Sequence, residues 1–175
     1  MFDLSEKQLE QDRQVANRDG LQLETVQGNM ADLSAFKNES FDLIVNPVSN
    51  MYVPSVLPVW REAYRVLRPG GYLLSGFTNP IVYLFDPEAE NEGRLDVKYS
   101  IPFSDVTSLH PELLQQYLDE GDPVIFGHSF EDQLQGQIDV GFMLAGMYED
   151  TYGGRRLLDR YISSFVATRS LKPSQ

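Results

Sequence analysis

The amino-acid sequence predicts an α/β fold, in which a mostly parallel sheet carries helices between its strands and an antiparallel hairpin at its C-terminal end. Residues 41–45 and residues from 72 onward are short apolar runs typical of buried strands, and a stretch of helical periodicity separates them. A strand, helix and strand of this kind form a right-handed parallel unit, whose sheet is buried on both faces. Two further apolar runs close together near the C-terminus predict the hairpin.

The first 47 residues predict one helix and two strands. Ser5 is suited to cap a helix that runs through Arg18. Residues 21–27 alternate imperfectly between apolar and polar side chains, which indicates a strand, and the loop "GNMADLSAF" follows. The apolar run 41–45 predicts a buried strand that stops at Asn46 and Pro47.

The middle of the sequence predicts the crossover helix and the strand after it. Between residues 54 and 67, apolar side chains recur at helical spacing, with charged side chains on the opposite side. Pro69 closes this helix, Gly70 and Gly71 supply turn positions, and "YLLSGF" starts a strand at Tyr72.

Residues 78–127 form a long excursion, which we interpret as a lid or binding loop because it exceeds an ordinary connection. It contains an acidic tract, a possible strand at 95–101 and a short helix at 111–119. Ser129 and Asp132 then resemble a capping box that opens a helix through residue 139. Residues 142–147 and 161–168 are the two predicted strands of the C-terminal hairpin.

The composition narrows the classes of function. A chain of 175 residues suits a single domain, residues 1–175, and its net charge of -12 disfavours binding to nucleic acid. It has no cysteine and only two histidines, which argues against a metal site. Neither a leader segment nor an apolar run of membrane-spanning length is apparent, so we expect a cytoplasmic protein without membrane partners.

Several segments together resemble the class I S-adenosylmethionine-dependent methyltransferases. They are "FDLSEKQLEQDRQVA", "GNMADLSAF", "FDLIVNPVSNMYV", "EAYRVLRPGGYLLSGF" and, near the C-terminus, "GFMLAGMYED" with "YISSFVATRSLK". The segments follow the order and spacing of that family, and together they cover nearly the whole chain. The resemblance implies a Rossmann-like methyltransferase sheet, with S-adenosylmethionine as cofactor and a small-molecule methyl acceptor.

One landmark of that family is absent from the sequence. The family's sheet opens with a strand and a glycine-rich turn that approaches the cofactor, yet the sequence contains no G-x-G-x-G. The resemblance therefore implies an N-terminally truncated, incomplete methyltransferase domain, and makes cofactor binding by this chain alone doubtful. An extension upstream of Met1 carrying that turn would favour a full enzyme.

The resemblance also implies where the cofactor binds. Asp3 matches the acidic residue that holds the ribose hydroxyls, and Asp32, with the backbone of Ala31 and Leu33, matches the adenine edge. Asn46 and Pro47 match the strand end beneath the methionine part. Each position also has an ordinary structural role, as a surface carboxylate, a loop Asp or a strand terminator.

The substrate residues are less defined. Relatives that methylate adenine or glutamine amides carry Asn-Pro-Pro and an aromatic residue, whereas this chain has Val48 and Ser49 in the last two positions. We take Asn50, Tyr52 and His128 as substrate candidates. His128 is also a candidate general base, although its place before Ser129 favours a role in that turn, and we name no catalytic residue. Aromatic residues of the excursion either line a pocket or pack together: Tyr83, Phe85, Tyr99, Phe103 and Tyr117.

Two classes of function stay open at this point, together with a prediction about assembly. The chain is either a methyltransferase, or part of one, or a methyltransferase-derived fragment that is inactive and serves as a structural or oligomerisation module. A nicotinamide-dependent dehydrogenase is disfavoured, because it needs the same glycine-rich turn. Without its central strand the sheet has an unpaired apolar edge, which predicts a homodimer formed through that edge or by exchange of residues 1–35.

Overall fold

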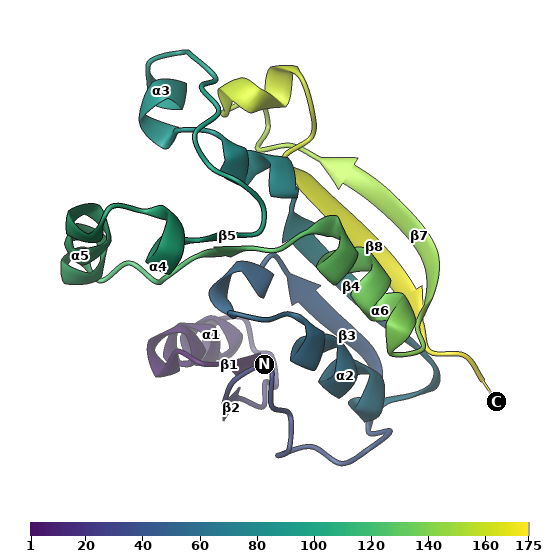
Figure 1. The fold of residues 1–175 in the computed structure, drawn as a ribbon. Helices are drawn as coiled ribbons and strands as arrows, with labels where there is room; N and C mark the ends of the chain where they lie inside the picture. Colours follow the sequence, from purple (N-terminus) through teal and green to yellow (C-terminus); the bar gives the residue numbers. More distant parts are fainter. Residues whose placement is uncertain (175) are drawn as a thin grey trace.

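The computed structural model describes residues 1–174, which form a four-stranded sheet, two small two-stranded sheets and the helices around them (Figure 1). The strands are β1 (Phe2–Asp3), β2 (Val26–Gln27), β3 (Phe41–Pro47), β4 (Leu67–Thr78), β5 (Phe103–Ser104), β6 (Phe126–Gly127), β7 (Met143–Asp150) and β8 (Phe165–Leu171). The α-helices are α1 (Glu6–Arg18), α2 (Leu57–Val66), α3 (Pro87–Asn91), α4 (Asp105–Ser108), α5 (Pro111–Glu120) and α6 (Gly136–Asp139). Within these residues, no helix is long and apolar enough to cross a membrane.

The four-stranded sheet has the order β3, β4, β8, β7. β3 and β4 are parallel and are joined by α2, while β8 runs antiparallel to both β4 and β7. The predicted α/β fold, with a parallel crossover and a C-terminal antiparallel hairpin, is confirmed. The hairpin lies at an edge of the sheet because β7 is the outermost strand.

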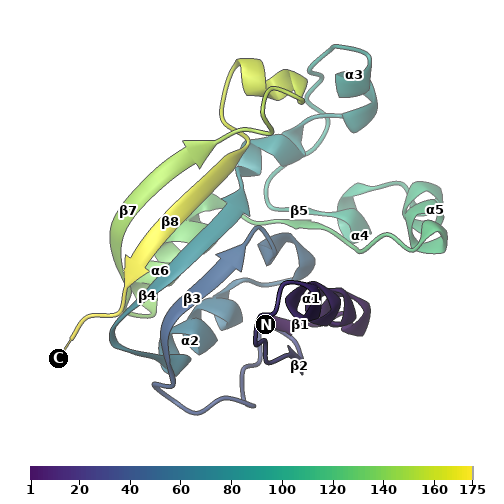
Figure 2. The same ribbon diagram turned by 180° about the vertical axis from the view of Figure 1, so that it is seen from behind.

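One face of this sheet packs against α2 and α6 (Figure 2). Leu73 and Leu67 of β4 are fully buried there against Trp60 of α2, in a cluster that includes Phe142. Gly136 at the start of α6 permits this close packing, since a Cβ at that position would lie 2.7 Å from the Leu57 side chain. The hydrophobic core of the chain therefore lies on this side of the sheet.

The other face of the sheet is exposed along much of its length, so the prediction that both faces are buried is wrong for residues 1–174. Leu43 and Val45 of β3 are 52% and 61% exposed, and Tyr72 and Leu74 lie opposite them on β4 at 38% and 37%. The helix between parallel strands can cover only one face, and no other helix of the described residues lies over the second (Figure 2).

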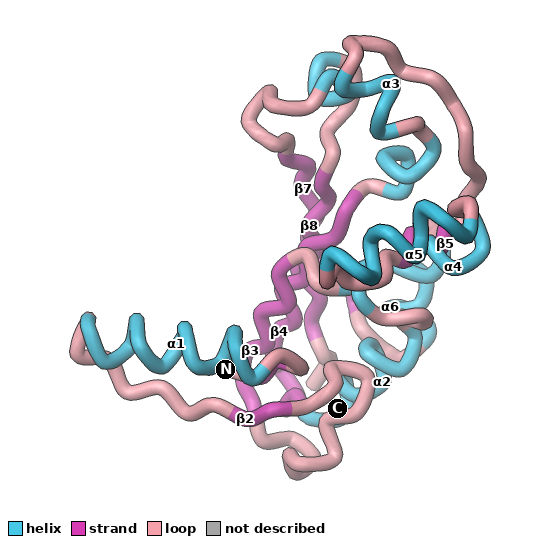
Figure 3. Tube along the Cα trace, turned by 90° about the vertical axis from the view of Figure 1, so that its left-hand side faces the viewer, coloured by secondary structure: helices cyan, strands magenta, loops and turns pink. Residues whose placement is uncertain are grey.

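β1, α1 and β2 form a separate N-terminal unit beside the free edge of β3 (Figure 3). β1 and β2 pair in parallel with each other, and β3 pairs only with β4 in the described part of the chain. The loop after β2 joins this unit to the main sheet, because the Phe36 ring makes edge contacts with both Phe2 and Phe41. The two parallel pairs thus belong to different sheets.

The excursion between β4 and the π-helical turn Glu131–Gln135 extends away from the main sheet (Figure 1). It carries α3, α4, α5 and the short β5–β6 pair, and α5 has no buried residue. The predicted strand at 95–101 is wrong: Val97 forms only an isolated bridge with Phe85. The predicted helix at 111–119 is confirmed as α5, which ends at Gly121 in a left-handed conformation.

Other boundaries differ from the sequence prediction for local reasons. Only the last two of residues 21–27 form a strand, because they alone pair with β1. β4 starts directly after α2, since Leu67 already pairs with Phe41. The predicted helix 129–139 is a π-helical turn followed by α6. β8 begins at Phe165, four residues late, because Phe165 is the first residue that pairs with β4, opposite its last residue, Thr78.

Candidate functional site

The carboxyl end of β3 leads into a strained turn. Ligands of open α/β sheets bind outside the carboxyl ends of parallel strands, and β3 ends there at Pro47. Val48 follows with φ of 47°, an unusual conformation for a β-branched residue, while its N–H donates to the carbonyl of Gly76 on β4 at 2.8 Å. Strain of this kind persists only where the surroundings over-determine it, and it is typical of functional sites.

Buried amides hold this turn in place. Asn46 Nδ2 donates to Asn50 Oδ1 at 2.8 Å, and Asn50 Nδ2 donates to Gln133 Oε1, also at 2.8 Å. Ser49 Oγ donates back to Asn46 Oδ1. Asn50 and Gln133 are only 1% and 3% exposed. The side chain of Asn46 is therefore fixed by a chain of hydrogen bonds that reaches the π-helical turn.

His128 is the third contact of Asn50. Its Nε2 lies 3.0 Å from the backbone carbonyl oxygen of Asn50, and the residue is 7% exposed. The short strand β6 brings it there, because β6 packs against the 3₁₀ turn Asn50–Tyr52. Two of the three substrate candidates, Asn50 and His128, are thus in direct contact, although they lie 78 residues apart.

The capping box that opens the π-helical turn is confirmed. Asp132 N donates to Ser129 Oγ at 3.1 Å and Ser129 N donates to Asp132 Oδ2 at 3.3 Å. The indole N–H of Trp60 donates to the Asp132 carbonyl at 2.9 Å, which ties the turn to α2. π-helical turns are frequent at functional sites, and this one supplies Gln133.

A second polar layer lies behind Gln133. Gln137 Nε2 donates to the Gln133 carbonyl at 2.7 Å, and Ser170 Oγ donates to Gln137 Oε1 at 2.6 Å. Two hydroxyls of β4, Ser75 Oγ and Thr78 Oγ1, are the buried side-chain atoms that lack a partner within residues 1–174. The hydrogen bonds of Gln137 fix the position of α6 relative to β8 and to the π-helical turn.

Asp3 lies at the carboxyl end of β1, as the sequence predicts. Its Oδ1 accepts the N–H of Ser5 at 2.7 Å, and its carbonyl accepts the N–H of Gly28 at 2.9 Å. Its Oδ2 makes no hydrogen bond to residues 1–174. The carboxylate therefore shapes the entry to α1 and keeps one oxygen for a donor from outside the protein.

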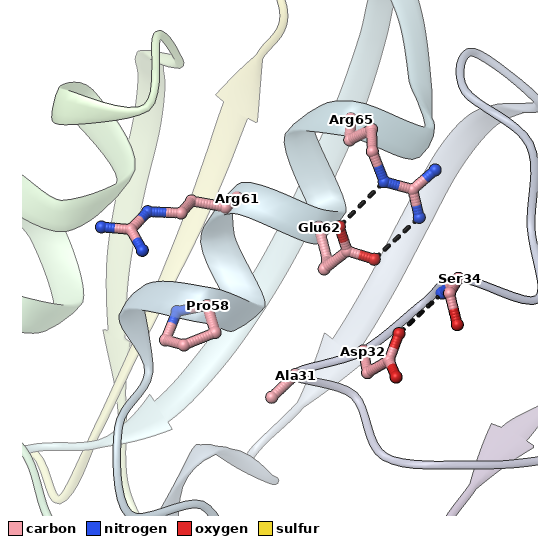
Figure 4. Close-up of a pocket in the computed structure, with 7 residues that line it drawn as sticks. All are labelled: Ala31, Asp32, Ser34, Pro58, Arg61, Glu62 and Arg65. Atoms are coloured by element: carbon pink, nitrogen blue, oxygen red, sulfur yellow. Dashed lines mark hydrogen bonds and ion pairs between the residues drawn. The ribbon is translucent and has the colours of Figure 1, made fainter.

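Asp32 lines an open cleft of about 500 Å³ between the loop after β2 and α2 (Figure 4). Its Oδ1 accepts the N–H of Ser34 at 3.0 Å, and this hydrogen bond lowers the pKa of Asp32, so the carboxylate is charged near neutral pH. A volume of this size suits a small organic ligand. The cleft is lined by Ala31, Asp32, Ser34, Pro58, Arg61, Glu62 and Arg65.

Glu62 and Arg65 form the wall of this cleft on α2 (Figure 4). Arg65 donates to both carboxylate oxygens of Glu62, at 2.8 and 2.7 Å, and lowers the pKa of Glu62. Arg65 also donates to the carbonyls of Leu33 and Phe36. One guanidinium thus holds the loop that carries Asp32 against α2.

The backbone donors of this loop are already engaged. Leu33 N donates to Glu62 Oε2 at 2.7 Å, and Ala31 N donates to Asn29 Oδ1 at 2.9 Å. In this conformation the two N–H groups are occupied by the protein's own side chains. Of the predicted adenine edge, Asp32 and Ala31 line the cleft, and Asp32 contributes the charged side chain (Figure 4).

The remaining candidates lie on the same side of the fold or pack within the excursion. Tyr52 is 49% exposed in the 3₁₀ turn after β3. In the excursion, Phe103 stacks on Tyr83 at 5.7 Å between ring centroids and contacts Tyr99 edge-on at 5.2 Å. Burial raises the pKa of Tyr83. These three rings therefore pack together, the second of the two roles that the sequence left open.

Sequence reasoning missed Gln133, Glu62 and Arg65. A glutamine inside a helical pattern carries no signal of a long-range contact, and Gln133 meets Asn50 across 83 residues. Glu62 and Arg65, three residues apart on one helix, are recognisable as a pair from their spacing. That spacing does not show that Arg65 also holds a distant loop.

The sequence of the chain is similar to those of known methyltransferases. Residues 1–75 match the family model of the methyltransferase domain. A Bacillus subtilis (strain 168) protein described as "Uncharacterized methyltransferase YbaJ" is 54% identical over 172 residues, which cover 98% of this chain and 67% of that protein.

Solved structures show the same fold. The structure of an S-adenosylmethionine-dependent methyltransferase from Mesorhizobium loti matches with a TM-score of 0.69 at 19% identity. The match covers 97% of this chain and 78% of the Mesorhizobium loti chain. A putative S-adenosylmethionine-dependent methyltransferase from Listeria monocytogenes has a TM-score of 0.67 at 18% identity, with coverages of 99% and 79%. The chain has the Rossmann-like fold of these enzymes.

The chain belongs to the class I S-adenosylmethionine-dependent methyltransferase family. S-adenosylmethionine is the cofactor of that family. Its ribose hydroxyls and adenine amine are hydrogen-bond donors, and they fit the free oxygen of Asp3 and the charged carboxylate of Asp32. The engaged N–H groups of Ala31 and Leu33 do not fit it in this conformation.

Proposed function

We propose that this chain binds S-adenosylmethionine at the carboxyl ends of β1 and β3 and transfers its methyl group to a small-molecule acceptor. The observation that carries the proposal is the strained turn after β3, which buried amides hold rigidly at the position where this fold binds ligands. The cleft beside Asp32 adds a charged acceptor on the adenosine side.

The residues have separate roles in this proposal. Asp3 holds the ribose hydroxyls and Asp32 holds the adenine amine. Asn46 and Pro47 border the methionine part, and the Asn50 and Gln133 amides fix the orientation of Asn46. The bound cofactor supplies an electrophilic methyl group. Alignment of that group with the acceptor supplies much of the rate, and a rigid turn favours alignment.

A small molecule is the acceptor class that the chain's charge favours. The net charge of -12 repels a phosphate backbone, whereas a small acceptor has only to enter beside Tyr52 and the excursion. The excursion extends from the end of β4 (Figure 1), and in this proposal it forms part of that entrance.

Calorimetric titration tests the proposal. The chain is titrated with S-adenosylhomocysteine and S-adenosylmethionine, with NADH as the control. Saturable binding of the two adenosyl ligands, and none of NADH, is the expected result. A folded sample that binds none of the three would contradict the proposal and favour an inactive, structural role.

We further propose that a second copy of this chain pairs with the free edge of β3. The edge is seven residues long, and its Leu43 and Val45 side chains are more than half exposed. An edge of this kind is a template for pairing with another strand. Exchange of residues 1–35 between two copies is the alternative.

A further inference from the structure

His128 has one ring nitrogen bound and the other open. A backbone carbonyl can only accept a hydrogen bond, so the contact with the Asn50 carbonyl at 3.0 Å makes Nε2 the protonated nitrogen of the neutral ring. Nδ1 then carries the lone pair. Nδ1 makes no hydrogen bond within residues 1–174, and it is not among the buried atoms that lack a partner, so solvent reaches it.

The ring is not used by the turn that follows it. Ser129 and Asp132 complete that turn with their own reciprocal hydrogen bonds, and the His128 ring points to Asn50 instead. The turn therefore does not explain His128. Its surroundings do orient it, since Asn50 is held at its side chain by Asn46 and Gln133.

We propose that His128 Nδ1 is the proton acceptor of the site, and that the methyl acceptor is a small molecule with an ionisable O–H or N–H group. This inference rests on the proposed methyl transfer. Asn50 and Gln133 are positioning residues, because they hold the carbonyl that selects the tautomer. The other histidine, His110, lies at the start of α5, and its side chain is 72% exposed.

The proposed reaction couples one proton transfer to one methyl transfer. The proton of the acceptor's O–H or N–H moves to Nδ1, which leaves the ring as an imidazolium. The freed electron pair forms a bond to the methyl carbon, and the carbon–sulfur bond breaks with its pair remaining on sulfur. The products are the methylated acceptor and S-adenosylhomocysteine, and the imidazolium returns its proton to water.

The first test is the tautomer of His128. Nitrogen-15 NMR of the ring nitrogens separates the two histidines, and His128→Gln assigns the signals. The proposal expects the neutral His128 ring to be protonated at Nε2. A ring protonated at Nδ1 would overturn it. His128→Gln is expected to fold, because a glutamine amide can still donate to the Asn50 carbonyl.

The second test is access to Nδ1 in the whole chain, with S-adenosylhomocysteine as the probe. Diethyl pyrocarbonate reacts with unprotonated imidazole nitrogen, and mass spectrometry separates His128 from His110. We expect both to be labelled without ligand. At about 100 times Kd nearly all of the protein is bound, and we expect both histidines to be labelled still, because Nδ1 faces the empty acceptor side and not the cofactor.

Each outcome decides between the two proposals. Loss of His128 labelling in the complex with S-adenosylhomocysteine, or no labelling of His128 at all, would overturn the role of His128 and leave the proposed methyl transfer standing. No calorimetric binding would overturn the methyl transfer, and the inference with it. Binding of S-adenosylhomocysteine by His128→Gln with unchanged Kd is expected, since the ring serves the acceptor and not the cofactor.

Discussion

The side-chain amide of Asn50 donates to Gln133 Oε1 at 2.8 Å, and this contact joins the end of a parallel strand to a π-helical turn 83 residues later. Both residues are almost completely buried. A buried amide that loses its partner keeps its full desolvation penalty, so the pair specifies one arrangement of the two segments. It also sets the geometry of Asn46 on one side and of His128 on the other.

Replacement of Gln133 tests this contact. Gln133→Leu removes the acceptor and leaves Asn50 Nδ2 buried without a partner, so we expect the free energy of unfolding to fall by about 1–3 kcal/mol. Urea denaturation measures it. Gln135→Ala is the control, because Gln135 is exposed on the same turn and, within residues 1–174, its side chain bonds only to Asp139. This variant is expected to change stability by less than about 0.5 kcal/mol. Equal effects of the two variants would contradict the role of Gln133.

Arg65 is expected to control the loop that carries Asp32. Arg65→Lys keeps the charge, but an ammonium cannot reach Glu62 and the carbonyls of Leu33 and Phe36 together. We expect faster amide hydrogen exchange in residues 31–38. The loss of stability is about that of one hydrogen bond to a charged group, 1.5–3 kcal/mol before screening by solvent.

Arg61→Lys is the matched control for Arg65. Arg61 lines the same cleft on the same helix, and within residues 1–174 it makes no ion pair. Exchange in residues 31–38 should not change in this variant. If Arg65→Lys left that exchange unchanged as well, the guanidinium would not be what holds the loop.

The ion pair of Glu90 and Arg156 predicts a pH dependence of stability. Arg156 Nε donates to Glu90 Oε1 at 3.2 Å and lowers the pKa of Glu90 below its ordinary value of 4.5. The stabilisation is therefore present in full above pH 4.5 and is lost as the pH falls through the lowered value. At neutral pH, the free energy of unfolding of the wild type should be higher than that of Glu90→Gln by roughly 1.5–3 kcal/mol.

Urea denaturation at neutral pH and at about pH 3 measures this difference, which should shrink at the lower pH. The pair joins α3 to the turn before β8, and the two side chains are 11% and 26% exposed, so solvent screens it little. Glu88→Gln, at an exposed position of the same helix, is expected to show no such difference. If the difference in free energy of unfolding between the wild type and Glu90→Gln did not change with pH, this would count against the ion pair.

The free edge of β3 predicts the state of association. Light scattering at micromolar concentration is expected to give twice the 19.9 kDa of one chain. Val45→Lys places a charge on the edge strand and should shift the protein toward the monomer. Leu21→Lys, at a similarly exposed position away from the sheet, should not. A monodisperse wild-type monomer would contradict pairing at this edge.

Local signals in the sequence predict much of the fold. Ser5 caps α1 as expected, and the box at Ser129 and Asp132 forms with its reciprocal hydrogen bonds. Pairing partners are not local, so the sequence could not show that residues 21–25 lack a strand neighbour. The exposed face of β3 and β4 was missed for a related reason: apolar Leu43 and Val45 indicate burial whether or not anything covers them.

The candidate site was predicted in part. Asp3 and Asn46 lie at strand ends because the ends of short apolar runs are visible in the sequence. The engaged N–H groups of Ala31 and Leu33 depend on Asn29 and Glu62, whose reach is a matter of side-chain conformation. The contact of His128 with Asn50 depends on how a 50-residue excursion returns to the sheet, which no short motif specifies.

Titration of matched variants with S-adenosylhomocysteine tests the central claim most directly. Asp3→Asn keeps an oxygen for the Ser5 N–H but loses the charge that would accept the ribose hydroxyls. Asp12→Asn, at a half-buried position on α1, is the control and keeps an oxygen for the Gln8 side chain. We predict saturable binding to the wild type, an affinity about 10- to 100-fold weaker for Asp3→Asn and no change for Asp12→Asn. Absence of binding to the folded wild type, or equal affinity of all three proteins, would contradict the account.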